Sequence, residues 1–86
     1  MALVYPHAGT AIYIPVELNG RLGRAVFRAV HQRSEAELFW HLDDRFLGKT
    51  RHFHEQAIIA EPGWHTLTLV DDQGFRLTHR FKVLGK

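Results

Sequence analysis

The sequence predicts a small all-β domain, an antiparallel β-sandwich of about seven short strands. The clearest signal lies in the C-terminal third, where the Pro62-Gly63 turn precedes a segment of alternating hydrophobicity. The Asp-Asp-Gln-Gly segment at 71–74 reverses the chain, and a second alternating segment then runs to Val83. In the rest of the chain, turn residues separate short apolar runs at intervals of about 8–12 residues, which is typical of a sandwich.

The first strands are expected to be short and to end at turn-forming residues. Residues 3–5 form a strand that ends at Pro6, before the turn at 8–10. Residues 11–14 are β-branched and aromatic, and Pro15 suits the end of a strand or a sheet edge. The segment 17–23 contains an Asn-Gly pair and a second glycine, so we expect a loop there.

The middle of the chain alternates strands with polar turns. In residues 25–31, Val26 and Val30 point to one face of the expected strand, and Phe27 and Ala29 point to the other. Residues 34–42 could begin a helix, but their Phe-Trp centre and the Asp-Asp pair that follows favour a strand. Further strands are expected at 37–42, 46–49 and 56–60, with turns at 32–35, 43–45 and 61–63.

Length and composition indicate one globular domain, residues 1–86. Apolar residues at 45% and charged residues at 23% are ordinary values. The chain has no cysteine, which excludes disulfides and thiolate metal sites. Its net charge is +2 and its charges are scattered along the sequence, so we expect no binding to nucleic acid. No apolar run reaches transmembrane length, and Met1-Ala2-Leu3 does not begin a signal peptide, so we expect no membrane insertion by this domain.

Period-two phasing selects the core of the sandwich. The residues expected inside are Phe27, Ala29, Leu38, Trp40, Leu42, Leu67, Leu69, Phe81 and Val83. Trp40 could instead be an exposed platform for a sugar or peptide, but large aromatic residues usually fill cores, which favours burial. Trp64 is out of phase with Leu67, so it either contacts a partner from the outer face or covers the end of the sandwich. His65 shares the inward phase and requires a hydrogen-bond partner there.

The seven histidines raise the question of a metal site. His52 and His54 would lie on one face of a strand, and the His-x-His spacing can ligate zinc or copper. The other candidate ligands are scattered, so we favour histidines beside a loop and expect no metal or other cofactor.

Catalytic chemistry finds little support in the sequence. The Asp43-Asp44 and Asp71-Asp72 pairs occupy expected hairpin turns, where Asp is favoured because it hydrogen-bonds the local backbone. Ser34 is the single serine and has no nucleophile motif around it, and no phosphate-binding glycine pattern occurs. We therefore expect a domain that binds, braces or positions and is not an enzyme.

Three segments of the chain resemble the C-terminal domain of class A penicillin-binding proteins of the 1C type. They are residues 4–15 (VYPHAGTAIYIP), 38–48 (LFWHLDDRFLG) and 62–74 (PGWHTLTLVDDQG). An aromatic-Trp strand, an Asp-rich turn and a Leu-Gly strand occur in that family, followed by a Pro-Gly-x-His-x-Leu-x-Val-x-Asp-x-x-Gly block. Trp64 departs from the pattern, because other members often have a polar or basic residue at this position.

The resemblance implies an Ig-like accessory domain at the C-terminus of a bifunctional peptidoglycan synthase. The parent enzyme would carry glycosyltransferase and transpeptidase domains and would face the periplasm from an inner-membrane anchor. The implied partners are the transpeptidase domain of the same chain, peptidoglycan, or an α2-macroglobulin-like envelope protein. The catalytic motifs of the parent are absent from these residues, so no catalytic residue is transferred to this chain.

Two functional classes remain open: an accessory module of a cell-wall synthase, which we favour, and a free-standing Ig-like adhesion or carbohydrate-binding module. In either case aromatic and arginine side chains would carry most of the contact energy. The candidate contact residues are Trp64, Arg76 and Arg80, the last two being in phase on one strand with Thr78 between them. The alternative is that this face is only solvated.

Overall fold

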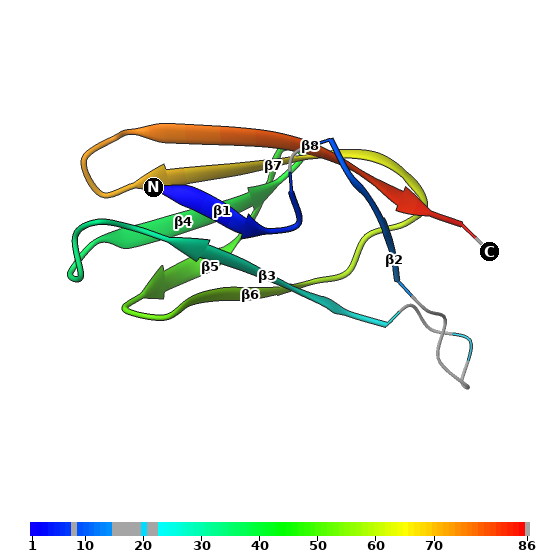
Figure 1. The fold of residues 1–86 in the computed structure, drawn as a ribbon, viewed down its shortest axis with the longest axis horizontal. Helices are drawn as coiled ribbons and strands as arrows, with labels where there is room; N and C mark the ends of the chain where they lie inside the picture. The colour runs from blue at the N-terminus through cyan, green and yellow to red at the C-terminus, as the bar shows by residue number, and fades with distance from the viewer. Residues whose placement is uncertain (8, 15–19, 21–22, 86) are drawn as a thin grey trace.

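Two sheets pack face to face in the computed structural model (Figure 1), which describes residues 1–7, 9–14, 20 and 23–85. Within these residues there are eight strands and no helix, which confirms the predicted all-β sandwich. The strands are β1 (Ala2–Tyr5), β2 (Ala11–Tyr13), β3 (Ala25–Val30), β4 (Glu37–Leu42), β5 (Arg45–Arg51), β6 (His54–Ile58), β7 (Gly63–Asp71) and β8 (Arg76–Leu84). The predictions for Pro15 and for most of the loop 17–23 fall outside the described residues.

One sheet has three strands in the order β1-β3-β6, and the other has five in the order β2-β8-β7-β4-β5. All pairings are antiparallel except that of β2 with β8, which is parallel. The chain crosses to the five-stranded sheet after β1, which belongs to the three-stranded sheet. The backbone N–H of Gly9 donates to the carbonyl oxygen of Arg80, and that of Lys82 donates to the carbonyl oxygen of Thr10. β2 thereby extends the edge of the larger sheet.

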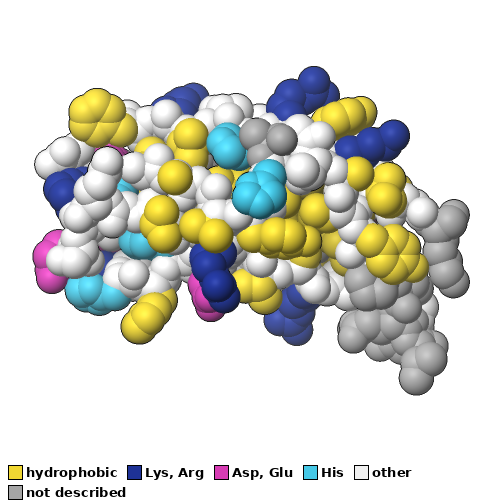
Figure 2. All heavy atoms as spheres, viewed as in Figure 1, with side chains coloured by type: hydrophobic (Ala, Val, Ile, Leu, Met, Phe, Trp, Pro, Cys, Tyr) yellow, Lys and Arg dark blue, Asp and Glu magenta, His cyan; other side chains and the backbone are white. Residues whose placement is uncertain are grey.

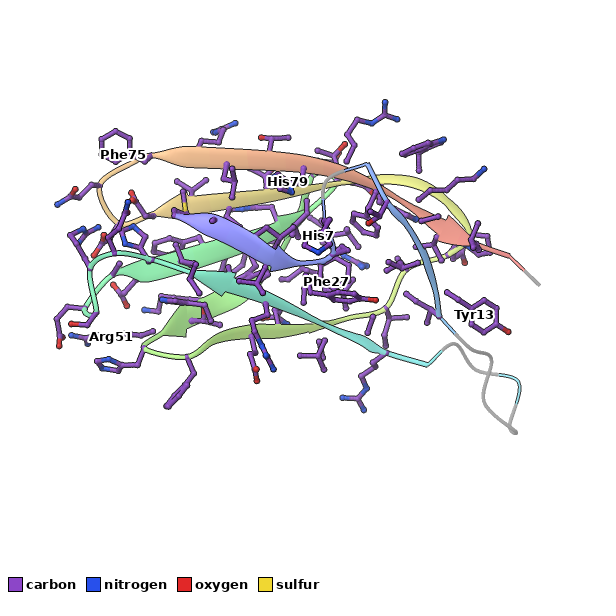
Figure 3. All side chains as sticks on the ribbon, viewed as in Figure 1. His7, Tyr13, Phe27, Arg51, Phe75 and His79 are labelled. Atoms are coloured by element: carbon purple, nitrogen blue, oxygen red, sulfur yellow. The ribbon has the colours of Figure 1, made fainter. Side chains whose placement is uncertain are left out.

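The core lies between the two sheets and matches the predicted alternation. All nine residues expected inside are buried, and Trp40 and Phe27 are completely inaccessible. Figure 3 shows Phe27 between the sheets, whereas Phe75 projects from the turn between β7 and β8. The rings of Phe27 and Phe81 meet edge to face, with 5.0 Å between their centroids. Because side chains of a strand alternate between faces, the residues between these core positions point to the two outer faces.

Polar contacts also join the two sheets at the side where β5 and β6 are the edge strands. The indole Nε1–H of Trp40 donates to the hydroxyl of Thr50 over 2.8 Å, and that hydroxyl lies 2.8 Å from Nδ1 of His54. Gly48 belongs to the same region, and a Cβ atom there would lie 3.2 Å from the side-chain oxygen of Gln56. A side chain at position 48 would therefore require the end of the Gln56 side chain to shift slightly.

One expectation about this region is wrong. His52 and His54 do not lie on one face of a strand, because the chain reverses at His52 and Phe53. His52 has a φ of 67°, and the N–H of Phe53 donates to the carbonyl oxygen of Arg51. β6 consequently begins at His54, two residues before the predicted strand. His52 is exposed at this reversal, whereas His54 is buried at the start of β6.

Candidate functional site

The three candidate contact residues lie on the outer face of the five-stranded sheet. Trp64 is 52% exposed, and Arg76 and Arg80 are exposed on β8 at alternate positions with Thr78 between them. The guanidinium carbon of Arg80 lies 5.0 Å from the centroid of the Trp64 ring, which is cation–π geometry. Trp64 thus belongs to the exposed outer surface, and the structure brings it together with Arg80, whereas Arg76 lies farther along β8.

Lys82 extends this surface, although the sequence analysis did not single it out. It pairs with Trp64 across the β7–β8 ladder and shares the outward phase of Arg80. We call Arg76, Arg80 and Lys82 the basic row. Figure 2 shows Lys and Arg side chains spaced along the rim of the molecule next to β8. The sequence could have predicted the outward position of Lys82, because Lys82 is two residues from Arg80 on the same strand.

The basic row has no ion pair within the described residues, as is also true of Arg24 and Arg45, whereas four other cations are paired. Arg28, Arg33 and Arg51 each lie within 2.8 Å of a carboxylate oxygen, on Glu55, Asp72 and Glu35 respectively. On strands β4 and β5 of the same sheet, Lys49 lies 3.1 Å from a carboxylate oxygen of Glu37. Within the described residues, no carboxylate oxygen is within 4.0 Å of a basic-row nitrogen. The row therefore keeps its charge uncompensated by these neighbours.

Hydroxyl groups line the surface beside the basic row. Thr66 lies opposite Arg80 and Thr68 lies opposite Thr78 in the β7–β8 ladder. Farther across the sheet, Phe39, His41 and Phe46 form an aromatic group with centroid separations of 6.5 Å and 5.3 Å from Phe46. The outer face of the five-stranded sheet therefore combines cations, hydroxyls and aromatic rings.

The outer face of the three-stranded sheet has a different character. Val26 and Val30 are about half exposed there, and Val4 and Ile59 are also exposed. Its charged pair in β3 and β6 is the mutually bonded Arg28 and Glu55. Figure 2 shows hydrophobic side chains gathered across the middle of the face in view, over β1 and β3. The two outer faces are thus chemically distinct.

His65 forms the structural corner that the sequence predicted, with its side chain 15% exposed. Its Nδ1 donates to Oδ2 of Asp43 over 2.9 Å, and its Nε2 donates to the carbonyl oxygen of Glu61 over 2.7 Å. Both partners can only accept, so the doubly protonated imidazolium fits this site. Desolvation opposes that charge, but the hydrogen bonds to Asp43 and Glu61 outweigh it and raise the pKa of His65.

Asp43 completes the corner from the turn between β4 and β5. Its Oδ1 accepts the backbone N–H of Thr66 over 2.9 Å. Desolvation would raise the pKa of Asp43, but the hydrogen bonds from His65 and Thr66 prevail and lower it. The ring of His65 also stacks on Phe81, with 5.7 Å between centroids. With both ring nitrogens engaged, His65 has no nitrogen available as a general base.

A second His–Asp pair stands at the opposite end of the sandwich, and the sequence analysis missed it. Nε2 of His31 donates to Oδ2 of Asp71 over 3.0 Å, while Nδ1 of His31 accepts the backbone N–H of Arg33. This pattern fits a neutral imidazole, unlike that of His65. Oδ1 of Asp71 accepts the N–H groups of Gln73 and Phe75. The bond from His31, followed by these backbone bonds, lowers the pKa of Asp71 against the opposing effect of its burial.

The remaining candidate metal ligands are dispersed. His54 is buried and its Nδ1 is engaged with Thr50, and desolvation lowers the pKa of His54. In the part of the chain that the structure describes, no three His, Asp or Glu side chains come together in a way that could hold a metal ion.

Ser34 lies in the turn between β3 and β4. The described residues also contain no helix that could cross a membrane.

Comparison with known proteins gives one match. Residues 1–81 match the model of the Penicillin-Binding Protein C-terminus Family, which is nearly the whole chain. Neither the curated proteins nor the solved structures give a match.

Proposed function

Because the chain belongs to the penicillin-binding protein C-terminus family, we propose that it is a non-catalytic accessory module of a bifunctional peptidoglycan synthase. The module docks the parent enzyme to peptidoglycan or to an envelope protein, or braces it through its own transpeptidase domain. It works in the periplasm, and the parent protein is anchored in the inner membrane. The family match supports this proposal, as does the engagement of both ring nitrogens of His65 and of His31 in internal hydrogen bonds.

The observation that carries the docking role is the exposed stack of Trp64 and Arg80 beside uncompensated cations. A half-exposed Trp gains nothing from the core, and Trp and Arg are the residues that most often dominate interface energies. The His65–Asp43 and His31–Asp71 pairs form internal hydrogen bonds, so these polar groups stabilise the fold. The outer face of the five-stranded sheet is therefore the contact surface that we propose for a partner.

The bracing role has its own supporting observation. The outer face of the three-stranded sheet presents half-exposed valines around a neutralised Arg28–Glu55 pair. Apolar patches with little net charge are typical of protein–protein contacts. A contact with the transpeptidase domain would use this face and would leave the basic row open.

The docking role is tested by co-sedimentation of the purified chain with purified peptidoglycan, and by binding to the purified transpeptidase domain of the parent. A triple variant, Trp64→Ala with Arg76→Ala and Arg80→Ala, should lose at least about tenfold in affinity for peptidoglycan. Arg28→Ala, on the opposite face, is the matched control and should bind like the wild type. Equal binding by the triple variant would remove this face from consideration.

The alternative, a free-standing Ig-like adhesion or carbohydrate-binding module, differs in its genetic context. A transpeptidase domain encoded directly upstream of Met1 would establish that the chain is an accessory module of a synthase. Binding to the transpeptidase domain without binding to peptidoglycan would favour a purely intramolecular brace.

A further inference from the structure

We infer that the outer face of β7 and β8 binds an extended acidic glycan that runs along β8. This inference rests on the proposed docking function and specifies the chemistry of the ligand. It is carried by three features of the face: the spacing of its cations, the cation–π contact of Arg80 with Trp64, and the threonine hydroxyls beside them.

The spacing of the basic row suits a linear polyanion. Outward-facing residues two apart on a strand are separated by about 6.7 Å, so Lys82 and Arg80 are neighbours and Arg76 follows about 13 Å from Arg80. The three cations thus lie on one line along β8, with Thr78 between the two arginines. A compact anion would reach at most the neighbouring Arg80 and Lys82, whereas an extended polymer with repeated negative groups could contact all three cations.

The Trp64 ring orients Arg80 for an anion. The cation–π contact places the guanidinium carbon over the indole, 5.0 Å from its centroid, and an arginine guanidinium can donate to a carboxylate or phosphate in a bidentate manner. Holding the long Arg side chain in advance lowers the entropy lost on binding. A row of cations is soluble without an aromatic neighbour. Solubility therefore does not explain the exposed Trp64 beside Arg80, whereas a role in positioning Arg80 does.

The shape of the face favours a glycan over a peptide. Peptides are usually bound by a free strand edge or in a groove with side-chain pockets. β7 and β8 are interior strands of the sheet, with β4 and β2 beside them. Two clefts of the described residues lie at the ends of the sandwich, beside His65 and beside His31. Arg76 borders the cleft beside His31, whereas Trp64, Arg80 and Lys82 line neither cleft. Thr66, Thr68 and Thr78 supply hydroxyls on the open face, which suit the many hydroxyls of sugars.

The experiment compares three polymers in calorimetric titrations of the purified chain. Polygalacturonate is a linear glycan with a carboxylate on each sugar, its methyl ester is the same glycan without charge, and poly-L-glutamate is an acidic peptide. We expect polygalacturonate to bind at least about tenfold more tightly than either of the others, with an affinity that falls as salt is raised. No binding of polygalacturonate, or equal binding of its methyl ester, overturns the inference.

Variants assign the binding to this face. Arg76→Ala with Arg80→Ala should weaken polygalacturonate binding at least about tenfold. Arg80→Lys keeps the charge but removes the planar stack, and should weaken binding by a smaller factor. Arg28→Ala should leave it unchanged, and equal losses in this control would contradict the assignment.

The two proposals fail in different ways. Peptidoglycan co-sedimentation that persists while polygalacturonate binds no better than its ester removes the acidic glycan and keeps the docking role. Poly-L-glutamate binding as tightly as polygalacturonate replaces the glycan with an acidic protein segment. Loss of binding to both peptidoglycan and polygalacturonate removes the docking role itself.

Discussion

Replacement of Trp40 by Ala should be among the most destabilising substitutions in this protein. The side chain is fully buried between the sheets, and its truncation removes a large apolar contact and leaves a cavity, at a cost of about 3–5 kcal/mol. It also removes the donor to Thr50, whose hydroxyl connects to His54. An 86-residue domain has a total unfolding free energy of about 4–13 kcal/mol, so this substitution removes a large share of the stability.

Trp40→Phe keeps the measurement interpretable because it retains most of the ring and removes the N–H. It should cost about 1–3 kcal/mol, through the lost hydrogen bond and the space left by the smaller ring. Trp64→Ala is the matched control, because this tryptophan is half exposed and contributes mainly its contact with Arg80, worth less than about 1 kcal/mol.

The assay is urea denaturation followed by circular dichroism, with the free energy of unfolding obtained by linear extrapolation. The expected order of loss is Trp40→Ala, then Trp40→Phe, then Trp64→Ala. A loss below about 1 kcal/mol for Trp40→Ala would refute its role as the centre of the core. Equal losses for Trp40→Ala and Trp40→Phe would show that the hydrogen bond, and not the packing, dominates at this position.

Other predictions concern the histidines and their acidic partners. Because the pKa of His65 is raised on folding, its contribution to stability is complete below about pH 6.5 and is lost as the pH rises through the folded-state pKa. Urea titrations across this range should show the loss in the wild type and not in His65→Gln. Asp71→Ala should cost about 1–3 kcal/mol because it leaves the buried side chain of His31 and the turn N–H groups of Gln73 and Phe75 without their acceptor. With the pKa of Asp71 lowered, the wild type should lose this contribution as the pH falls below about 4, whereas Asp71→Ala should not, and parallel pH profiles would contradict the assignment. Calorimetry should detect no tight stoichiometric zinc binding, and zinc binding that disappears on mutation of His52 and His54 would contradict this. A labelled β-lactam should not acylate the chain.

Local patterns predicted the strands and the core because both depend on neighbouring residues. The alternation of Leu67 and Leu69 with polar residues sets which face of β7 is buried, and the Asp-Asp-Gln-Gly turn sets its partner. The inward position of His65 followed from the same phase, and so did the outward position of Trp64.

Features that depend on distant segments were not predictable in this way. His31 and Asp71 are 40 positions apart, and no local signal relates them. The reversal at His52 depends on a positive φ that no glycine or asparagine marks. Leu47 is an additional residue in β5, because Phe46 pairs with His41 while Gly48 pairs with Trp40. The chemistry of the candidate surface was only partly visible, because the stacking of Arg80 on Trp64 requires the strand register.

The parallel pairing of β2 with β8 has a mechanical consequence. The two termini lie at opposite ends of the long axis, and β1 and β8 run along it (Figure 1). Tension applied through the ends first loads the pairing of β1 with β3. Once β1 has separated, the tension pulls β2 from its N-terminal side and β8 from its C-terminal side, in opposite directions along parallel strands. The interstrand hydrogen bonds are then loaded together in shear, so they must break together and not one after another. The domain is thereby arranged to resist stretching, and the weakest direction for its rupture lies across the strands.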